Sequence, residues 1–196
     1  MGPEEALLRP SRLYRAEEVR GRDCPIPAAP GVYAWYFTSL PPLVPVAGCH
    51  RRDAAVLLYV GISPKAPPSN GRPPSQQTIR SRIRYHYRGN AAGSTLRLSL
   101  GSLLADELEI SLKRVGSGKR LTFGRDGENR LTAWMAEHAQ VVWTATDQPW
   151  KLEEELIRSC VLPLNLDQNR HSSFHSQLSA LRAAQRTHAR LLPAER

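Results

Sequence analysis

Glu153 is a carboxylate that stands among apolar side chains in the sequence. Segment 147–162 (DQPWKLEEELIRSCVL) predicts a helix with Asp147 as its N-cap and Pro149 in the first turn. At about 100° per residue its apolar positions share one face: Trp150, Leu152, Leu156, Ile157, Cys160 and Val161. Glu153 points along the middle of this face, so it needs a proton, hydrogen-bond donors or a cation. One structural alternative is an ion pair with an arginine at the edge of the core.

Arg82 and His86 form a second candidate pair. They lie one turn apart on a predicted helix from about 76 to 88, for which Ser75 is the expected N-cap. The apolar stripe of this helix, which should face a sheet, is Ile79, Ile83 and Tyr87. Arg82 and His86 border that stripe, which is where the side chains of a cleft are placed. The alternative is an ordinary basic surface.

Positive charge is concentrated in one segment. The chain has a formal net charge of +9, and residues 65–97 contain seven of its cations and no acid. Apart from Arg82, these are Lys65, Arg72, Arg80, Arg84, Arg88 and Arg97. Because the planar arginine fork suits phosphate oxygens, we expect these residues to bind a nucleic-acid backbone. A solvated basic face is the simpler alternative.

The expected elements alternate between strands and helices, which predicts an α/β (α+β) domain. The predicted strands are 31–37, 55–61 and 141–146, of which the first two should pair as neighbours, and a hairpin is expected over 108–123. Besides the two helices above, helices are predicted over 15–20, 96–104, 131–138 and 173–192. Three scattered cysteines indicate neither a disulfide framework nor a zinc site.

The order of the candidate residues is more specific than any one of them. Along the chain come Gly31-Val32-Tyr33, Tyr59-Val60-Gly61, Arg82, His86, Glu153 and Asn165. This set resembles the GIY-YIG nuclease family, with valine in place of isoleucine in both tripeptides. The resemblance covers roughly residues 31–169, in patches separated by inserts. It implies a small, mostly antiparallel sheet of about three strands flanked by helices.

The resemblance also implies roles for the strand and carboxylate residues. Glu153 would be the ligand of a single divalent cation, Mg²⁺ or Mn²⁺, which favours carboxylate oxygen. Tyr33 would activate the attacking water, and Tyr59 would shape the site. Gly61 would leave room for substrate beside the strand. In isolation, both tyrosines are also compatible with plain strand aromatics.

Three further residues receive roles by the same resemblance. Arg82 would stabilise charge on the scissile phosphate, and His86 would act as a proton relay or as a hydrogen-bonding partner of the tyrosine or water. Asn165 would orient the site by hydrogen bonding, although after Pro163 it could merely make a turn.

Organisation and partners follow from these expectations. We expect a lead-in over 1–30, a nuclease domain over 31–170 with inserts at 38–53, 64–74 and 96–139, and a basic C-terminal helix within 171–196. The later inserts and this helix are the expected substrate contacts. The predicted function is metal-dependent endonuclease activity in the cytoplasm, on DNA in preference to RNA, by a monomer or homodimer without membrane contact. The alternative is a nucleic-acid-binding module on the same scaffold without useful turnover.

Overall fold

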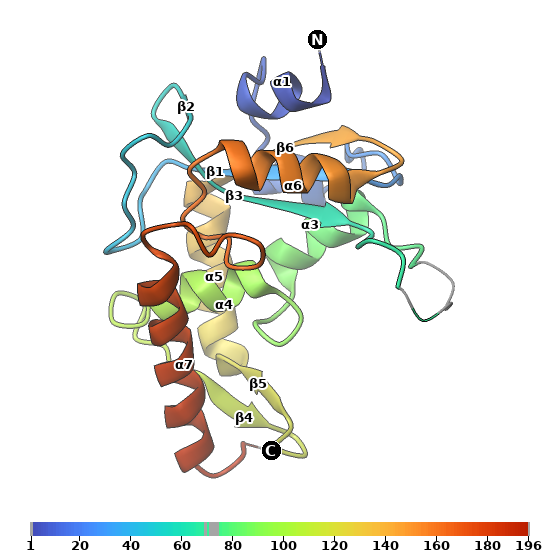
Figure 1. Ribbon diagram of the computed structural model, residues 1–196. Helices are drawn as coiled ribbons and strands as arrows, with labels where there is room; N and C mark the ends of the chain where they lie inside the picture. The colour runs from blue at the N-terminus through green and yellow to red at the C-terminus, as the bar shows by residue number, and fades with distance from the viewer. Residues whose placement is uncertain (1, 69, 71–74, 196) are drawn as a thin grey trace.

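The central sheet has four antiparallel strands in the order β2-β3-β1-β6 (Figure 1). The computed structural model describes residues 2–68, 70 and 75–195. The four strands are β1 (Gly31–Phe37), β2 (Arg51–Arg52), β3 (Ala55–Ser63) and β6 (Ala139–Ala145). A separate hairpin pairs β4 (Lys113–Val115) with β5 (Arg120–Thr122). The mixed fold with an antiparallel sheet is therefore confirmed, with the short β2 added to the three predicted strands.

Both faces of the sheet are buried, because every residue of the central strand β1 is buried. Successive side chains of a strand point to opposite faces. Val32, Ala34 and Tyr36 pack into one apolar cluster with α1 and α6 residues. Tyr33, Trp35 and Phe37 pack into the larger cluster on the other face, which includes residues of α2 to α5. Alternation along β1 therefore decides that Tyr33 faces the α3 side.

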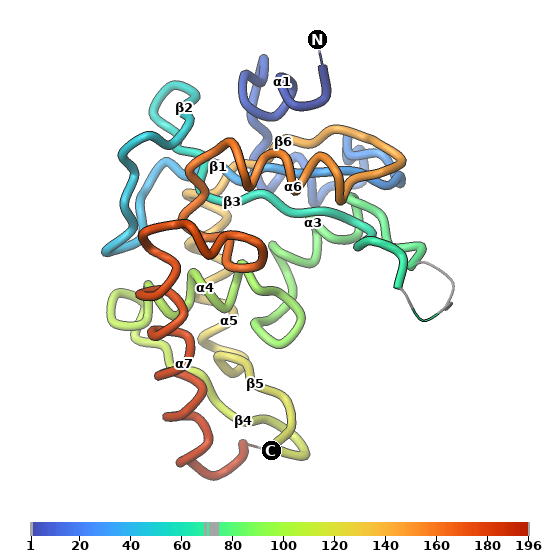
Figure 2. The backbone as a smooth tube through the Cα atoms, viewed as in Figure 1, coloured from blue at the N-terminus to red at the C-terminus, as the bar shows by residue number. Residues whose placement is uncertain are grey.

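The described part of the chain contains seven helices, and α1, α3 and α6 pack against the sheet (Figure 1). They are α1 (Pro3–Leu8), α2 (Ala16–Arg20), α3 (Ile79–Arg88), α4 (Thr95–Leu103), α5 (Gly124–His138), α6 (Pro149–Ser159) and α7 (His175–Leu191). Helix α7 runs alongside α4 and the β4–β5 hairpin, at the end of the molecule away from α1 (Figure 2). None of the helices within the described residues is long and apolar enough to cross a membrane.

Helix starts differ from the sequence predictions by a few residues. Helix α3 begins after Thr78, whose side chain accepts a hydrogen bond from the Ser81 amide, so the predicted cap Ser75 is wrong. Helix α6 has Gln148 rather than Asp147 as its N-cap. Helix α1 was not predicted, and it is fixed because the Tyr36 hydroxyl donates to the Leu7 carbonyl at 2.7 Å.

A buried ion pair joins three helices beneath the sheet. Arg97 on α4 is fully buried and bonds Glu128 on α5 through Nε at 2.9 Å and a terminal nitrogen at 2.6 Å. It also donates to the carbonyl oxygen of His86 at the end of α3. The other carboxylate oxygen of Glu128 accepts the amides of Ala91 and Phe123. The prediction that Arg97 contacts nucleic acid is therefore wrong, because its donors are used inside the core.

We predict that Glu128→Ala destabilises the fold by about 3–5 kcal/mol, since it leaves a buried arginine and two buried amides without their acceptor. Urea unfolding followed by circular dichroism measures the change. Glu137→Ala, which removes an exposed carboxylate from the same helix, is the matched control. Equal stability of the two variants would show that the ion pair contributes nothing.

Candidate active site

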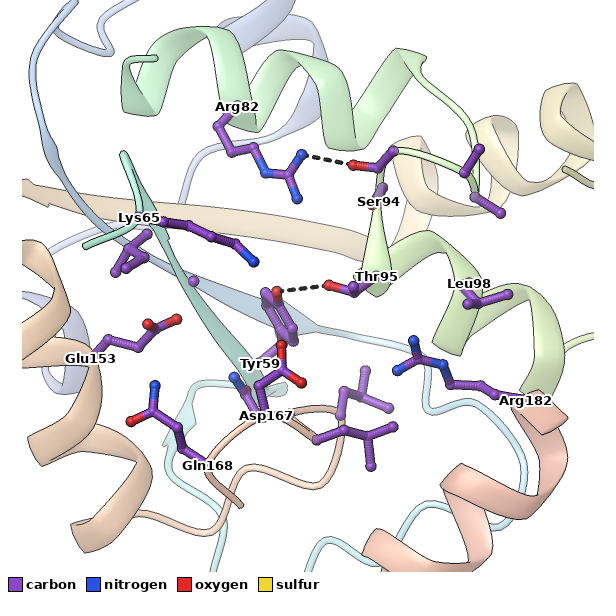
Figure 3. Close-up of a pocket in the computed structure, with 18 of the residues that line it drawn as sticks. Tyr59, Lys65, Arg82, Ser94, Thr95, Leu98, Glu153, Asp167, Gln168 and Arg182 are labelled. Carbon is purple, nitrogen blue, oxygen red and sulfur yellow. Dashed lines mark hydrogen bonds between the residues drawn. The ribbon is translucent and has the colours of Figure 1, made fainter. Parts of the chain in front are cut away.

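A cavity of about 1030 Å³ collects five of the six predicted catalytic residues (Figure 3). Its lining includes Tyr33, Tyr59, Arg82, Glu153 and Asn165, which come from β1, β3, α3, α6 and the segment after α6. His86 does not line the cavity but lies directly behind Tyr33. Residues that are up to 132 positions apart, from Tyr33 to Asn165, therefore meet at one place.

Tyr33, His86 and Ser94 form a buried hydrogen-bonded chain. The Tyr33 hydroxyl lies 2.8 Å from Nε2 of His86, and Nδ1 of His86 lies 2.7 Å from the Ser94 hydroxyl. Ser94 also caps α4 by accepting the Arg97 amide. A neutral imidazole donates from one nitrogen and accepts at the other. With the proton on Nδ1, His86 donates to Ser94 and can accept the Tyr33 proton at Nε2.

Burial holds both members of this pair in their neutral forms. The pKa of His86 is lowered well below its usual value, first by burial and then by the nearby charges of Arg82 and Arg97. The pKa of Tyr33 is raised well above 10, by burial and then by Tyr59, while Arg82 acts in the opposite direction. The resting state is therefore a phenol beside an uncharged imidazole, with a guanidinium positioned to favour phenolate.

Gly61 provides the space that Tyr33 occupies. The two residues are cross-strand partners in β3 and β1, and a Cβ at Gly61 would lie 2.6 Å from the Tyr33 hydroxyl oxygen. The tyrosine ring therefore fills the room where a side chain of residue 61 would lie. Gly61 also lines the cavity, so the expectation that it leaves room for substrate stays a prediction.

Arg82 and Tyr59 are oriented by the loop between α3 and α4 and by the first residue of α4 (Figure 3). A terminal nitrogen of Arg82 donates to the Gly93 carbonyl at 2.7 Å, and the Tyr59 hydroxyl lies 3.4 Å from the Thr95 hydroxyl. Burial is the main reason that the pKa of Tyr59 is raised. The loop and the start of α4 therefore direct a guanidinium and a phenol into the same cavity.

Glu153 lies at the cavity wall, where the apolar face of α6 ends. Leu156 and Ile157 pack into the core, whereas Glu153 is only partly buried and points into the cavity (Figure 3). The expectation that it points along the middle of a core face is thus corrected. Burial raises its pKa to about 7, while Lys65 lowers it and Asp167 raises it. Among the described residues, no cation forms an ion pair with this carboxylate.

The side-chain amide of Asn165 makes the two hydrogen bonds to β3 that the backbone of a neighbouring strand would make. Its Oδ1 accepts the Val60 amide and its Nδ2 donates to the Val60 carbonyl, both at 2.9 Å. The Leu164 amide also donates to the Leu58 carbonyl. Asn165 thereby fixes the segment that carries Asp167 and Gln168 against the strand that carries Tyr59. Its side-chain hydrogen bonds are with the backbone of Val60, and its role in orienting the catalytic residues stays a prediction.

The basic residues that were predicted to bind nucleic acid do not all lie on one surface. Lys65 lines the cavity, and Arg72 lies outside the described residues. Arg80, Arg84 and Arg88 are absent from the cavity lining and donate to carbonyls of Ile26, Val19, Gly21 and Arg20. These three arginines therefore attach α3 to α2 and to the segment after it, and their binding of nucleic acid stays a prediction.

Several cavity residues were not assigned as site residues from the sequence. Lys119 and Arg120 enter from the β4–β5 hairpin, Arg182 and Arg186 from α7, and Asp167 from the segment after Asn165. The first four lie in the insert and the C-terminal helix that were expected to contact substrate. Asp167 stands two positions after Asn165, and only this proximity could have indicated it. None of the lining comes from the insert at 38–53.

Comparison with known families agrees with this arrangement. Residues 31–184 match the family model described as the GIY-YIG catalytic domain, so the chain belongs to the GIY-YIG family. No curated protein and no solved structure shows significant similarity to it. The match begins at Gly31, includes all six predicted catalytic residues and extends into α7. It establishes a nuclease domain, and hence nucleic acid as the class of substrate.

We predict that Gly61→Ala lowers nuclease activity by about 100-fold, because the added methyl displaces the Tyr33 ring from His86. Initial rates of cleavage measure the effect. Gly21→Ala, at a glycine with φ −64° outside the cavity, is the control. Unchanged rates for Gly61→Ala would mean that the hydroxyl position of Tyr33 does not matter.

We also predict that Glu153→Gln stabilises the metal-free protein at pH 8, by about 1–3 kcal/mol. The folded pKa of about 7 exceeds the usual 4.5. The unfolded chain therefore loses this proton first, and stability falls as pH rises from about 4.5 through 7. Glutamine does not titrate, so the Glu153→Gln variant keeps this stability as pH rises. The difference in stability between the variant and wild type should therefore vanish near pH 4. Thermal melting in EDTA at both pH values measures it, with exposed Glu155→Gln as the control.

Proposed function

We propose that this protein is a divalent-metal-dependent endonuclease that hydrolyses phosphodiester bonds in DNA, in the cytoplasm. The observation that carries the proposal is the convergence of the Tyr33–His86 pair, Arg82 and Glu153 on one cavity. The family match supports nuclease chemistry in general. The preference for DNA rests on the family resemblance, because the cavity cations address backbone phosphates common to DNA and RNA.

The Tyr33–His86 pair supports activation of water. A water that attacks phosphorus must lose a proton, and the Tyr33 oxygen can accept it while passing its own proton to Nε2 of His86. This transfer avoids a free phenolate, which the raised pKa of Tyr33 disfavours. The imidazolium that forms keeps its Nδ1 proton and donates it in a hydrogen bond to the Ser94 hydroxyl. Because the pKa of His86 is lowered by burial and by Arg82 and Arg97, this imidazolium is a transient species that returns its proton within the same turnover. Arg82 provides positive charge beside both the phenol and the incoming phosphate.

Glu153 is the type of ligand that Mg²⁺ or Mn²⁺ prefers. These cations favour carboxylate oxygen and retain several waters, so one or two carboxylates and a substrate phosphate suffice. Within the described ranges there is no group of three or more His, Cys, Asp or Glu residues, which agrees with a sparse ligand set. Asp167 is close enough to raise the pKa of Glu153, so a cation held by Glu153 would offset the repulsion between the two carboxylates. When bound, such an ion would stabilise negative charge on the phosphate.

A cleavage assay tests this proposal. Purified protein is incubated with plasmid, single-stranded DNA and RNA in Mg²⁺, Mn²⁺ or EDTA. We expect wild type to cut DNA only with metal, and Glu153→Gln to cut at least about 100-fold more slowly, since it lacks the anionic ligand. Glu155→Gln, an exposed acid on the same helix, should retain the wild-type rate.

Equal rates for wild type and Glu153→Gln would refute the catalytic role of Glu153. If both proteins bind DNA and neither cuts any substrate, the binding-module alternative replaces the proposal. Faster cleavage of RNA than of DNA would correct the substrate while leaving the chemistry intact.

A further inference from the structure

A second, smaller hollow adjoins the cavity at α7. It has a volume of about 680 Å³, and Leu166, Asp167, Gln168, Arg182 and Arg186 line both spaces, so the two are continuous. Its remaining lining residues are Arg170, His175 and Ser179. Three arginines and a histidine thus face a single acid, Asp167, across a hollow that opens from the proposed cleavage site.

Arg182 is buried at the junction of the two spaces without a matching acceptor. Only 8% of its surface is exposed, and its Nε has no hydrogen-bond partner among the described residues. It forms no ion pair with any described acid, including the neighbouring Asp167. A buried guanidinium with an unused donor is costly unless an anion binds it.

The electrostatic surroundings of Arg182 add to this cost. Burial and then the positive charge of Arg186 lower the pKa of Arg182, while Asp167 and Tyr59 act in the opposite direction. Arg186 follows Arg182 by one helical turn and lies over the same hollow. Two adjacent guanidinium groups suit an acceptor with several anionic oxygens, which is what a phosphate offers.

The position of this pair relates it to the catalytic residues. Figure 3 shows Arg182 reaching from α7 toward the cavity on the side opposite Glu153, with Tyr59 and Asp167 between them. Arg82 lies beyond Tyr59, near the loop that carries Ser94. A strand whose scissile phosphate lies beside Arg82 and Glu153 would therefore extend past Tyr59 toward α7.

We propose that Arg182 and Arg186 form a second phosphate subsite, which binds a backbone phosphate of the same strand next to the one that is cleaved. This inference rests on the proposed nuclease function. It assigns to α7 the task of fixing the direction in which the strand crosses the cavity. It also accounts for the unused donor of Arg182, which no contact within the described chain satisfies.

Binding measurements in the Glu153→Gln background test the subsite without cleavage. The probes are a short fluorescein-labelled DNA duplex and its single strand, titrated at several salt concentrations. We expect Arg182→Met to weaken binding by about ten-fold and to reduce the slope of log affinity against log salt by about one. Arg182→Lys should restore the slope but only part of the affinity, because lysine keeps the charge and loses the fork.

The matched control is Arg51→Met, which removes an exposed arginine from β2, outside both hollows. It should change neither affinity nor slope. Thermal melting separates binding from a structural role. Because methionine replaces a buried guanidinium that has no ion-pair partner, the Arg182→Met variant should have a melting temperature equal to or above that of its parent. Arg182→Met that melts lower and binds normally would overturn the proposal.

Cleavage kinetics distinguish this proposal from the proposed function. In the otherwise wild-type protein, Arg182→Met should raise KM with a smaller effect on kcat, whereas Glu153→Gln should lower kcat. Metal-dependent cutting that is insensitive to Arg182→Met would refute the subsite alone. A wild-type protein that neither binds nor cuts either probe would refute both.

Discussion

The ion pair between Arg97 and Glu128 is the constraint on which the geometry of the candidate active site depends. It lies in the core, where an incomplete set of hydrogen bonds is costly, so α4, α5 and the end of α3 have to meet in one arrangement. Ser94 lies three residues before Arg97 and bonds the Arg97 amide, so the same arrangement fixes its hydroxyl. That hydroxyl contacts His86, which contacts Tyr33. The phenol of Tyr33, which we propose activates water, is thus positioned by a charge pair outside the cavity.

Local patterns were sufficient to predict most of the fold and the side chains that share the cavity. The apolar runs of β1 and β3 and the periodicity of α3 and α6 arise within short windows, where burial dictates spacing. The order of Tyr33, Tyr59, Arg82 and Glu153 then indicated one site, and the structure brings these side chains to one cavity. Helix starts were less predictable, because serine and threonine are both good caps and both precede α3, at Ser75 and Thr78; in the structure Thr78 is the cap.

Charge along the sequence did not reveal which side of the molecule each arginine faces. Arg97 belongs to the same acid-free segment as Arg82, yet its partner is an acid 31 residues later. Conversely, Lys119 and Arg182 are far from that segment and reach the cavity only because α7 packs beside α4 and β4. The net charge therefore indicated an anionic substrate correctly as a class, while the surface that meets it depends on tertiary packing.

The two flanks of helix α3 have different structural roles. One flank carries Arg82 to the cavity and His86 to the back of Tyr33. The other is tied by Arg80, Arg84 and Arg88 to carbonyls of residues 19–26. That segment precedes the family match, which begins at residue 31. Attachment from behind removes rotational freedom of the helix during folding, before any substrate arrives. In the proposed nuclease, the N-terminal lead-in therefore lowers the entropy lost on reaching the transition state, without touching the substrate itself.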